Sequence, residues 1–563
     1  MTSSFAPFLV FVVGAVLAAI TQGRLRQTIL VAVPVVGVVN LYLLPAGSAA
    51  TVQMFDYTLV LLRVDRLSVA FGTVFHLAAL LGFVYALRVR DTVQHVAGLL
   101  YAGSAIGAVF AGDLITLFVF WEITAVASVF LILARRTDRA RRAATRYFVI
   151  QVLSGVVLLA GALVRVHETG SIAFGDIGLD GPGGALILFA FGLKAAFPLL
   201  HNWLTDAYPE ATPTGTVFLS AFTTKLAVYA LARGFPGTEI LVYVGAAMTV
   251  FPIFYAVIEN DLRRVLSYSL INQVGFMVTG IGIGTPLAIN GAVSHAFAHV
   301  IYKALLFMAM GAVLHRTGRI NGSELGGLYK SMPVTTVLCL VGAASISAFP
   351  LFSGFVSKSM VLAAALDEGY RGVWLALLFA SAGVFHHSGI KIPYFTFFAH
   401  DSGIRTREAP PNMLAAMFLA AFVCVFLGVY PWPLYDLLPF PVDFQPYTAS
   451  HVLAQSQLLF FSAAAFTVLM LTGLYPPELP GLNIDAEWVY RRLVPRSVRG
   501  AIAIFAPLDA SLRQAAVEGA RHAVGLVRRQ SGPLGLLART RTVGGMVGWV
   551  IALLVLYLIL NFV

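Results

Sequence analysis

Apolar stretches of about 18–25 residues recur from one end of this chain to the other, and they constrain the fold more than any other feature. A stretch of this length spans the roughly 30 Å hydrocarbon core of a bilayer as an α-helix. Hydrophobic residues make up 59% of the 563 residues and charged residues only 11%, whereas a soluble domain has about 25% charged residues. One soluble core cannot bury so much apolar surface, so the sequence predicts an all-α polytopic membrane protein.

Sixteen transmembrane helices are expected from these stretches. The seventh and the twelfth contain glycine and proline close to a lysine, so we expect both to be broken helices. The predicted spans are 3–21, 28–46, 58–87, 93–111, 114–134, 147–165, 184–203, 214–233, 239–258, 264–283, 287–314, 333–366, 372–399, 412–430, 453–474 and 543–562.

Arginines are concentrated in alternate loops between the spans. The loop arginines are Arg24, Arg26, Arg88, Arg90, Arg135, Arg136, Arg139, Arg141, Arg142, Arg146, Arg263, Arg264, Arg316, Arg319, Arg405 and Arg407. By the positive-inside rule these loops are cytoplasmic, which predicts a multi-pass protein of the cell membrane with both termini outside. The net charge of +11 therefore requires no nucleic acid as a partner. The first nine residues contain no Lys or Arg, so the first span is expected to be a retained helix rather than a cleaved signal peptide.

The region before the last span has a different composition. Residues 481–542 contain ten Arg and only four Asp or Glu. Within it, Pro507–Arg529 has an amphipathic pattern and would form a helix about 35 Å long. Two interpretations remain open: a helix on the cytoplasmic membrane surface with arginines at lipid phosphates, or a strut that docks on a neighbouring subunit.

Charged side chains lie deep inside several predicted spans, where each costs about 2.5–3.5 kcal/mol or more. Glu122 lies in the fifth span, Lys194 in the seventh and Lys225 in the eighth. Such residues persist when they pair, line water or take part in transport. The alternatives are a purely structural ion pair between Glu122 and Lys194, and a Lys225 side chain that extends to the membrane surface.

A further polar group lies in the eleventh span. His295, His299 and Lys303 are spaced four residues apart and so share one helix face. The histidines resemble a zinc pair, but Ala296 stands where an HExxH motif has its glutamate, and the sequence offers no third ligand. The two cysteines of the chain form no CxxC motif. We therefore predict no metal and no bound cofactor, and we interpret the face as a polar relay, with structural hydrogen bonding as the alternative.

The buried lysines are arranged in two similar pairs. Lys194 precedes Lys225 by 31 residues, and Lys358 precedes Lys391 by 33 residues. In each pair a broken helix carries the first lysine and the next helix carries the second. Five spans per copy would invert the second copy, and inverted repeats with broken helices near the midplane are a common transporter design. For Lys391 a packed structural role is the alternative.

These features predict six regions. Residues 1–92 would hold helices 1–3, 93–233 the first inverted repeat, and 239–400 the second. Residues 412–474 would hold helices 14 and 15, 475–542 a cytoplasmic basic amphipathic segment, and 543–563 the C-terminal helix.

Five motifs resemble those of the antiporter-like subunits shared by respiratory complex I and the Mrp multisubunit sodium/proton antiporters. Together they are highly specific, and the resemblance covers most of residues 55–430, with the Mrp D-type as the nearest. Two of them read Gly192-Leu-Lys194-Ala-Ala-Phe-Pro and His295-Ala-Phe-Ala-His299-Val-Ile-Tyr-Lys303. The motifs lie in Leu62–Ser68, Gly112–Glu122, Gly192–Thr214, Asp261–Ser269 and His295–Ala304.

The resemblance implies a role for each buried polar residue. Glu122 would pair with Lys194, and Lys225 would pass protons toward the centre. The histidine–lysine face of the eleventh span would form a central hydrated relay, and Lys358 would end the path at the opposite exit. A buried lysine holds its proton less tightly than one in water, and a nearby carboxylate strengthens that hold. Moving Glu122 toward or away from Lys194 would therefore load or release a proton.

The C-terminal part departs from these relatives. The Mrp D-type and complex I M-type proteins end after fourteen spans, and the complex I L-type has sixteen joined by a very long lateral helix. The amphipathic segment expected here is much shorter, so the sequence does not define the parent complex.

The sequence therefore predicts a proton-translocating, antiporter-like subunit of a multisubunit membrane complex, in which sodium or potassium ions are possible coupled cations. Its partners would be other membrane subunits, and it would carry no redox chemistry of its own, even within a translocase such as an NADH:quinone oxidoreductase-like complex. The alternatives are a proton-channel partner in an inorganic-carbon uptake or membrane-bound hydrogenase-type complex, a stand-alone sodium/proton exchanger, and a structural scaffold.

Overall fold

The computed structural model describes residues 5–47, 49–479, 481, 483–533, 535, 538 and 542–562. The chain forms two units, Met1–Asp485 and Ala486–Val563. Residues 3 and 4 of the first predicted span lie outside the described residues, as do parts of the predicted 475–542 segment and the last residue of the predicted C-terminal helix. Each unit is taken here by itself.

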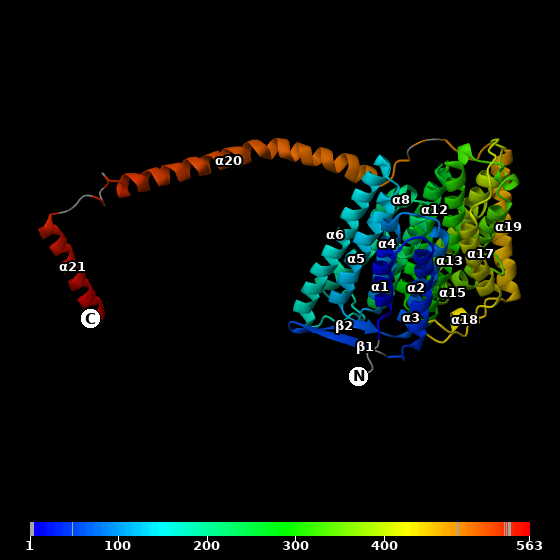
Figure 1. Cartoon of the computed structure of the whole chain (residues 1–563), viewed down its shortest axis with the longest axis horizontal. Coiled ribbons are helices and arrows are strands. Elements are labelled where there is room, and N and C mark those ends of the chain that lie inside the picture. The colour runs from blue at the N-terminus through cyan, green and yellow to red at the C-terminus, as the bar shows by residue number, and fades with distance from the viewer. Residues whose placement is uncertain are drawn as a thin grey trace. The chain divides into compact units, whose positions relative to one another are not determined.

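Helices make up nearly all of the first unit, which confirms the predicted fold class (Figure 1). Its α-helices are α1 (Pro7–Ile20), α2 (Gly23–Leu43), α3 (Arg66–Ala86), α4 (Thr92–Phe110), α5 (Leu114–Leu133), α6 (Asp138–Thr169), α7 (Pro182–Ala195), α8 (Asn202–Glu210), α9 (Gly215–Ala221), α10 (Thr223–Gly234), α11 (Ile240–Ile258), α12 (Leu262–Ile283), α13 (Pro286–Thr317), α14 (Pro333–Ile346), α15 (Ser353–Asp367), α16 (Arg371–Val384), α17 (Pro411–Val429), α18 (Trp432–Tyr435) and α19 (Ala449–Leu471). Its short 3-10 helices are η1 (Gly322–Glu324) and η2 (Leu328–Lys330), and its π-helices are η3 (Phe385–Lys391) and η4 (Tyr394–Phe398).

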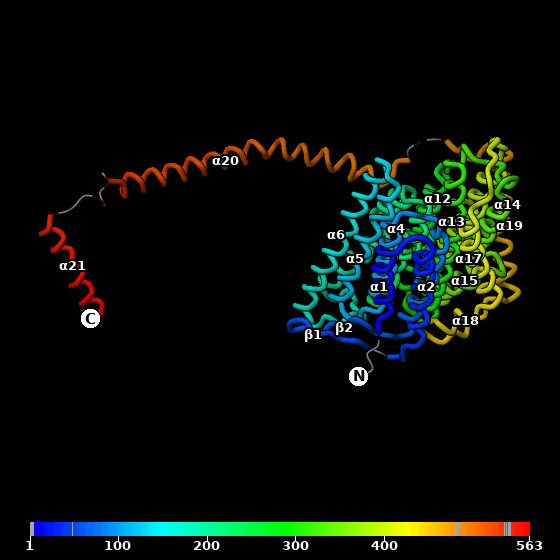
Figure 2. The backbone as a smooth tube through the Cα atoms, in the orientation of Figure 1, coloured from blue at the N-terminus to red at the C-terminus, as the bar shows by residue number. Residues whose placement is uncertain are grey.

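Thirteen helices among the described residues of the whole chain are long and apolar enough to cross a membrane. Three shorter apolar helices, α1, α7 and α14, accompany them. The predicted count of sixteen spans therefore stays a prediction. Figure 2 traces the helices of the first unit as one bundle whose axes run in the same general direction. Other helices cover 94% of the apolar window of α12 and of α13, but only 17% of that of α19, so the core lies around α12 and α13.

A β-hairpin occupies the connection between the second and third predicted spans and the first residues of the third. Strands β1 (Ala49–Met54) and β2 (Tyr57–Arg63) pair in antiparallel fashion. The third predicted span, which was expected from residue 58, therefore begins only at Arg66. Its start is fixed by a capping box in which the Asp65 carboxylate accepts from the Ser68 amide at 2.9 Å and the Ser68 hydroxyl accepts from the Asp65 amide at 2.9 Å.

Two successive runs of helices have matching lengths. Helices α4 and α11 both have 19 residues, α6 and α13 both have 32, and α7 and α14 both have 14. Helices α6 and α13 also end alike, at Gly170 and Gly318, each with a φ of 70° in the left-handed region. These matches support the predicted repeat.

The chain leaves the helical conformation at both predicted breaks, between α7 and α8 and between α14 and α15. Each break has the sequence Ala-Phe-Pro-Leu, at residues 196–199 and at residues 348–351. In both, the Ala and the Leu have positive φ, at 64° and 69° in the first break and 56° and 74° in the second. A positive φ is unfavourable for residues with a Cβ, so the surrounding helices must hold both breaks in this conformation.

The lysines do not occupy matching places at the two breaks. Lys194 lies two residues before Ala196, whereas Lys358 lies in α15, ten residues after Ala348. The similar spacings of the two lysine pairs therefore do not reflect equivalent positions, and the interpretation of the pairs as matched is wrong in this respect.

The second unit consists of η5 (Val489–Leu493), a long helix α20 (Val494–Ser531) and α21 (Val543–Phe562). Helix α20 has 38 residues, with Pro507 inside it, whereas the sequence predicted a helix only from Pro507 to Arg529. At 1.5 Å per residue it is about 57 Å long. None of its described side chains is buried within the second unit.

Packing around the second break is so close that Gly428 should tolerate no side chain. A Cβ added to Gly428 of α17 would lie 2.2 Å from the carbonyl oxygen of Leu351 in the break. Because backbone atoms cannot move aside easily, we expect Gly428→Ala to destabilise the protein by about 1–3 kcal/mol, measured by thermal unfolding in detergent. Gly372→Ala is the control, since nothing lies within 4 Å of its added Cβ. An equal loss of stability in both variants would show that the contact with Leu351 is not the cause.

Candidate functional site

All seven predicted site residues lie in the first unit, on helices α5, α7, α10, α13 and α15. The four lysines and two histidines are at most 1% exposed, and Glu122 is partly buried. The residues are Glu122, Lys194, Lys225, His295, His299, Lys303 and Lys358. Burial of so many titratable groups is costly unless each has polar partners.

Lys194 lies in the last turn of α7 and is held by α5. Its Nζ donates to the Trp121 carbonyl oxygen at 3.1 Å and to Thr124 Oγ1 at 3.0 Å. The same Nζ lies 4.1 Å from the centre of the Trp121 ring, a cation–π contact worth up to about 2 kcal/mol in a desolvated site. The ammonium therefore has three favourable neighbours, and none of them is a carboxylate.

Glu122 projects from α5 into space left by a glycine. A Cβ added to Gly155 of α6 would lie 1.5 Å from Glu122 Oε1. This oxygen is buried and has no hydrogen-bond partner among the described residues. The expected ion pair is also absent from the described part of the chain, where no carboxylate oxygen lies within 4.0 Å of Lys194 Nζ. The structure thus holds acid and lysine as neighbours that are not in contact.

Lys225 lies at the joint between α9 and α10. Its Nζ donates to the Ser220 carbonyl oxygen at 2.6 Å and to Thr224 Oγ1 at 3.2 Å. Ser220 lies in the last turn of α9, where the free carbonyl groups carry the negative end of the helix dipole. The interruption at Phe222 therefore supplies the oxygen atoms that the ammonium needs.

A cluster of hydroxyl groups lies close to Lys225 along the chain. Thr223 Oγ1 contacts the Tyr101 hydroxyl, and the same Thr223 Oγ1 lies 3.3 Å from the Tyr147 hydroxyl. The Tyr147 hydroxyl also lies 2.8 Å from Ser128 Oγ. These contacts join α4, α5, α6 and α10 in one polar layer.

The two histidines of α13 have different surroundings. His295 Nδ1 lies 3.0 Å from Ser357 Oγ, and its Nε2 lies 3.4 Å from the Tyr302 hydroxyl, which donates to Gln273 Oε1 at 2.9 Å. His299 is buried, and neither of its ring nitrogens has a partner among the described residues. A buried imidazole with two free nitrogens is a natural place for water.

Lys303, one turn further along α13, connects to a second polar layer. Its Nζ donates to Ser269 Oγ of α12 at 2.8 Å and to the Leu266 carbonyl oxygen at 3.4 Å. Ser388 Oγ of η3 donates to the same Ser269 oxygen at 2.8 Å, and His387 Nδ1 lies 2.8 Å from Ser388 Oγ. This extension was not predicted, because serines in apolar helices carry no clear sequence signal.

Lys358 is bound at the second break. Its Nζ donates at 2.8 Å to the carbonyl oxygen of Ile346, the last residue of α14, and lies 5.2 Å from the centre of the Phe276 ring. As at Lys225, a helix end near the middle of the bundle offers an unpaired carbonyl oxygen to an ammonium.

Lys391 forms an ion pair that the sequence did not predict. Its Nζ lies 2.8 Å from Glu478 Oε1, with exposed side-chain fractions of 0% and 5%. Glu478 comes from the stretch after α19. A second acid of this stretch, Asp485, accepts from the Tyr268 hydroxyl at 2.7 Å and lies 3.0 Å from His201 Nε2. Acids in a polar loop look like ordinary surface residues, so only the fold reveals them.

Helix α6 places other side chains where α13 has the relay face. Counted from Asp138 and Pro286, the first residues of the two helices, Tyr147 corresponds to His295, Gln151 to His299 and Gly155 to Lys303. Gln151 is buried with neither side-chain polar atom partnered among the described residues, like its counterpart His299. The two halves thus share a polar face but differ in its chemistry.

Within the described ranges, no three His, Cys, Asp or Glu side chains are placed to hold a metal ion. The rings of His295 and His299 have centres 6.3 Å apart. The arrangement therefore offers proton-accepting and proton-donating groups rather than a ligand set.

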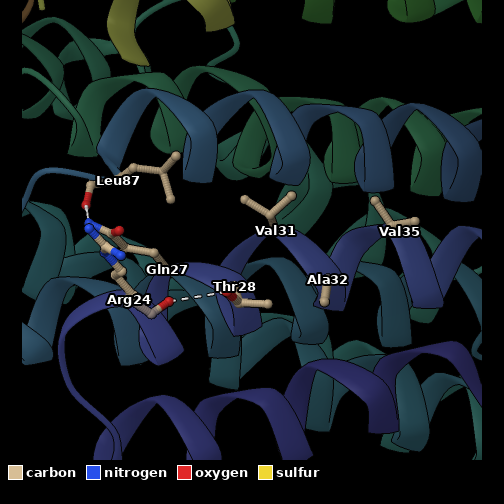
Figure 3. Close-up of a pocket in the computed structure, with 7 residues that line it drawn as sticks. All are labelled: Arg24, Gln27, Thr28, Val31, Ala32, Val35 and Leu87. Atoms are coloured by element: carbon tan, nitrogen blue, oxygen red, sulfur yellow. Dashed lines mark hydrogen bonds between the residues drawn. The ribbon is translucent and has the colours of Figure 1, made fainter. Parts of the chain in front are cut away.

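A groove on the outer helices is separate from these residues. Figure 3 shows it beside α2, with Gln27 donating to the Leu87 carbonyl oxygen at 3.0 Å. Its volume is about 650 Å³, with Arg24 and Gln27 at one end and the apolar residues Val31 and Val35 further along α2. No residue of the candidate site lines it.

The fold and the site define a class of polytopic membrane proteins that hold a row of titratable side chains between two interrupted helices. Comparison with known proteins gives the family. Residues 111–386 match the family described as NADH:quinone oxidoreductase/Mrp antiporter, TM. The NADH-quinone oxidoreductase N-type protein of Desulforudis audaxviator is 30% identical over 361 residues, which cover 59% of this chain and 72% of that protein. The chain belongs to this family.

Two further similarities agree with the family. The D-type component of the Na(+)/H(+) antiporter of Alkalihalophilus pseudofirmus is 33% identical over 312 residues, which cover 52% of this chain and 63% of that protein. This chain therefore spans less than two thirds of that relative. A chain of the membrane-bound sulfane sulfur reductase, an archaeal respiratory membrane complex, has a TM-score of 0.71 at 23% identity, and the match covers 98% of this chain and 99% of that one. The likeness shows a common fold.

The contacts predict opposite stability effects for two buried lysines. Lys225 has no carboxylate partner among the described residues, so Lys225→Met leaves no buried charge unpaired and is expected to be neutral or stabilising. Lys391→Met would leave Glu478 buried without its partner and should cost about 3–5 kcal/mol. Thermal unfolding of the two variants in detergent measures the difference. Equal destabilisation would show that Lys225 has a structural role like that of Lys391.

Proposed function

We propose that the chain is a proton-translocating, antiporter-like subunit of a multisubunit membrane complex. The observation that carries the proposal is the row of buried titratable side chains, from Glu122 and Lys194 through Lys225 and α13 to Lys358, each beside oxygen atoms or rings. Every charge buried in a membrane costs about 2.5–3.5 kcal/mol or more. A scaffold would gain nothing from keeping seven such groups, whereas a proton path requires them.

The separation of Glu122 from Lys194 supports a switch in the first half. In this structure the lysine bonds to Trp121 and Thr124, and the acid rests against Gly155. Approach of the carboxylate would strengthen the hold of Lys194 on its proton, and retreat would weaken it. The structure then corresponds to the separated state, in which Lys194 can pass its proton on.

The central groups support transfer between the halves. His299 has two ring nitrogens that water can reach by hydrogen bonding, and His295 is connected through Tyr302 to Gln273. Neutral imidazole can accept a proton on one nitrogen and release one from the other. Lys225 on one side and Lys358 on the other would exchange protons with this central group.

The matched helices support two inverted repeats as the frame of the path. We propose that residues 93–233 and 239–400 are these repeats, each with its own break. The predicted orientation, with the arginine-rich loops in the cytoplasm and both termini outside, follows from the positive-inside rule. It places Arg264 and Glu259, which lie 3.9 Å apart at the junction of α11 and α12, on the cytoplasmic face.

The second unit supports assembly with other membrane subunits. Helix α20 exposes large apolar side chains such as Phe505, Leu508 and Leu512, at 62%, 56% and 62%. Its opposite side is rich in arginine, which suits a helix at a membrane surface or along neighbouring subunits. At about 57 Å it is long enough to reach beyond one neighbour.

Removal of the switch groups tests the proposal. We expect Lys194→Ala and Glu122→Ala each to reduce proton flux at least tenfold, because the first half would lose the group that carries the proton or the one that controls it. Flux is measured with the full-length protein in liposomes, using an internal pH dye and an imposed potassium diffusion potential, and in membranes that contain its native partners.

Activity of the purified chain alone would favour a stand-alone exchanger, and activity only in native membranes would favour a subunit. Amounts of protein and assembly size serve as the control for folding. Full proton flux in a well-folded Lys194→Ala variant would overturn the mechanism.

The glycine beside Glu122 offers an independent test. Gly155→Val would fill the space of the Glu122 carboxylate, since even a Cβ would lie 1.5 Å from Oε1. We expect this variant to lose most of its proton flux although every titratable residue is still present. Leu153→Ala, an exposed position on the same helix, is the control. Normal flux in Gly155→Val would show that the position of Glu122 is unimportant.

A further inference from the structure

The stretch of chain after α19 inserts a carboxylate beside a buried lysine. Tyr475 of this stretch packs against the rings of His386 and Phe466, with centres 5.5 and 5.2 Å apart. Three residues further on, Glu478 reaches Lys391 at 2.8 Å. This stretch lies outside both predicted repeats, so the contact adds a group that the repeat pattern cannot supply.

The Lys391 ammonium is surrounded by oxygen atoms at the end of α11. It donates to the carbonyl oxygens of Ala256, Val257 and Glu259 at 3.3, 2.6 and 2.7 Å. Since these carbonyls lie at the C-terminal end of α11, they carry the negative end of its dipole. Both the cage and Glu478 favour the protonated lysine, so a proton that arrives here is held until the carboxylate accepts it.

A chain of polar contacts leads from the central relay toward this site. Lys303 donates to Ser269, Ser388 donates to the same hydroxyl, and His387 contacts Ser388, each at 2.8 Å. His387 Nε2 is buried and has no partner among the described residues, so it is available to a bridging water. Lys391 lies four positions further along the same segment.

That segment, η3, is a π-helix, and a second π-helix, η4, follows it in the same span. Such widened turns are rare and often occur at functional sites. Here the widened turn carries both His387 and Lys391, and it begins directly after the regular helix α16 ends at Val384. Both titratable groups of this branch therefore lie on the same π-helical turn.

We propose that Lys391 and Glu478 form an outlet of the relay at the arginine-rich face of the membrane, with Glu478 as the terminal proton-transfer group. The inference rests on the proposed function and adds a branch, because the family resemblance ends the path at Lys358. The face is identified by Glu259, which contacts Arg264 at 3.9 Å and Asn483 at 3.3 Å as well as closing the Lys391 cage.

The transfer is a simple proton exchange. An N–H bond of the Lys391 ammonium breaks and an O–H bond forms on Glu478 Oε1, which leaves a neutral amine and a neutral acid. The amine takes the next proton from the side of His387, and the acid releases its proton to water at the face. Burial raises the pKa of the Glu478 carboxyl, although Lys391 acts in the opposite direction, so the acid is suited to hold a proton briefly. Its neighbour Leu479 is 63% exposed, so the acid lies one residue from the surface of the chain.

The alternative is that Glu478 and Asp485 only fix the stretch after α19 to the bundle and take no part in proton transfer. Glu478→Gln distinguishes proton transfer from anchoring. Its amide oxygen can still accept from Lys391, but the side chain can no longer take up and release a proton. We expect Glu478→Gln to lower proton flux at least tenfold in full-length protein reconstituted in liposomes, and Glu478→Asp to restore part of it. Asp485→Asn is the matched control, since this acid is also buried in the same stretch, and its flux should stay within twofold of the wild type.

The outcomes are distinct from those of the proposed function. If Lys194→Ala abolishes flux while Glu478→Gln transports normally, the outlet is overturned and the main relay stands. If Asp485→Asn loses as much flux as Glu478→Gln, anchoring explains both and the terminal role of Glu478 is overturned. If the wild type itself moves no protons, in liposomes and in native membranes, the proposed function fails first. Assembly size and thermal unfolding of each variant confirm that it is folded.

Discussion

An ammonium group inside a membrane needs oxygen atoms, and the helices of this protein supply them by stopping within the bundle. Within a helix the carbonyl groups are bonded internally, but the C-terminal end of each helix leaves up to four of them free. Lys225 bonds to the end of α9 and Lys358 to the end of α14, both at interruptions, whereas Lys391 bonds to the end of the complete span α11. At Lys225 and Lys358 the interruption and the lysine are therefore one feature, because the break supplies the carbonyl oxygen and the ammonium satisfies it.

Neighbouring helices must hold these interruptions in place. The Ala-Phe-Pro-Leu segments keep non-glycine residues at positive φ in both breaks, which the chain would not adopt by itself. Around the second break the packing allows no side chain at Gly428, and a Cβ on Gly354 would lie 1.8 Å from the Ser345 carbonyl oxygen. Close helix contacts thus fix the geometry on which the lysine sites depend.

Much of this arrangement was predictable from sequence because the membrane permits few solutions. Long apolar stretches specify helices, and charges within them, such as Lys194 and Lys303, stand out against their surroundings. The same reasoning missed strand β2, whose apolar residues cannot be distinguished from the start of a span by hydropathy. It also missed Glu478, since an acid in a polar loop gives no sign that the fold will bury it. The separation of Glu122 from Lys194 depends on the space beside Gly155 of the neighbouring helix α6, which sequence spacing does not encode.

The two halves share a frame but not a chemistry, and one pair of positions shows why. The eighteenth residue of α6 is Gly155 and that of α13 is Lys303. A glycine there leaves room for the Glu122 carboxylate from α5, whereas a lysine fills the same place and bonds to Ser269 of α12. At this position the proposed first repeat therefore has room for an acid beside its lysine, and the proposed second repeat does not. The acid that pairs with Lys391 comes instead from outside the proposed second repeat, since Glu478 lies in the stretch after α19.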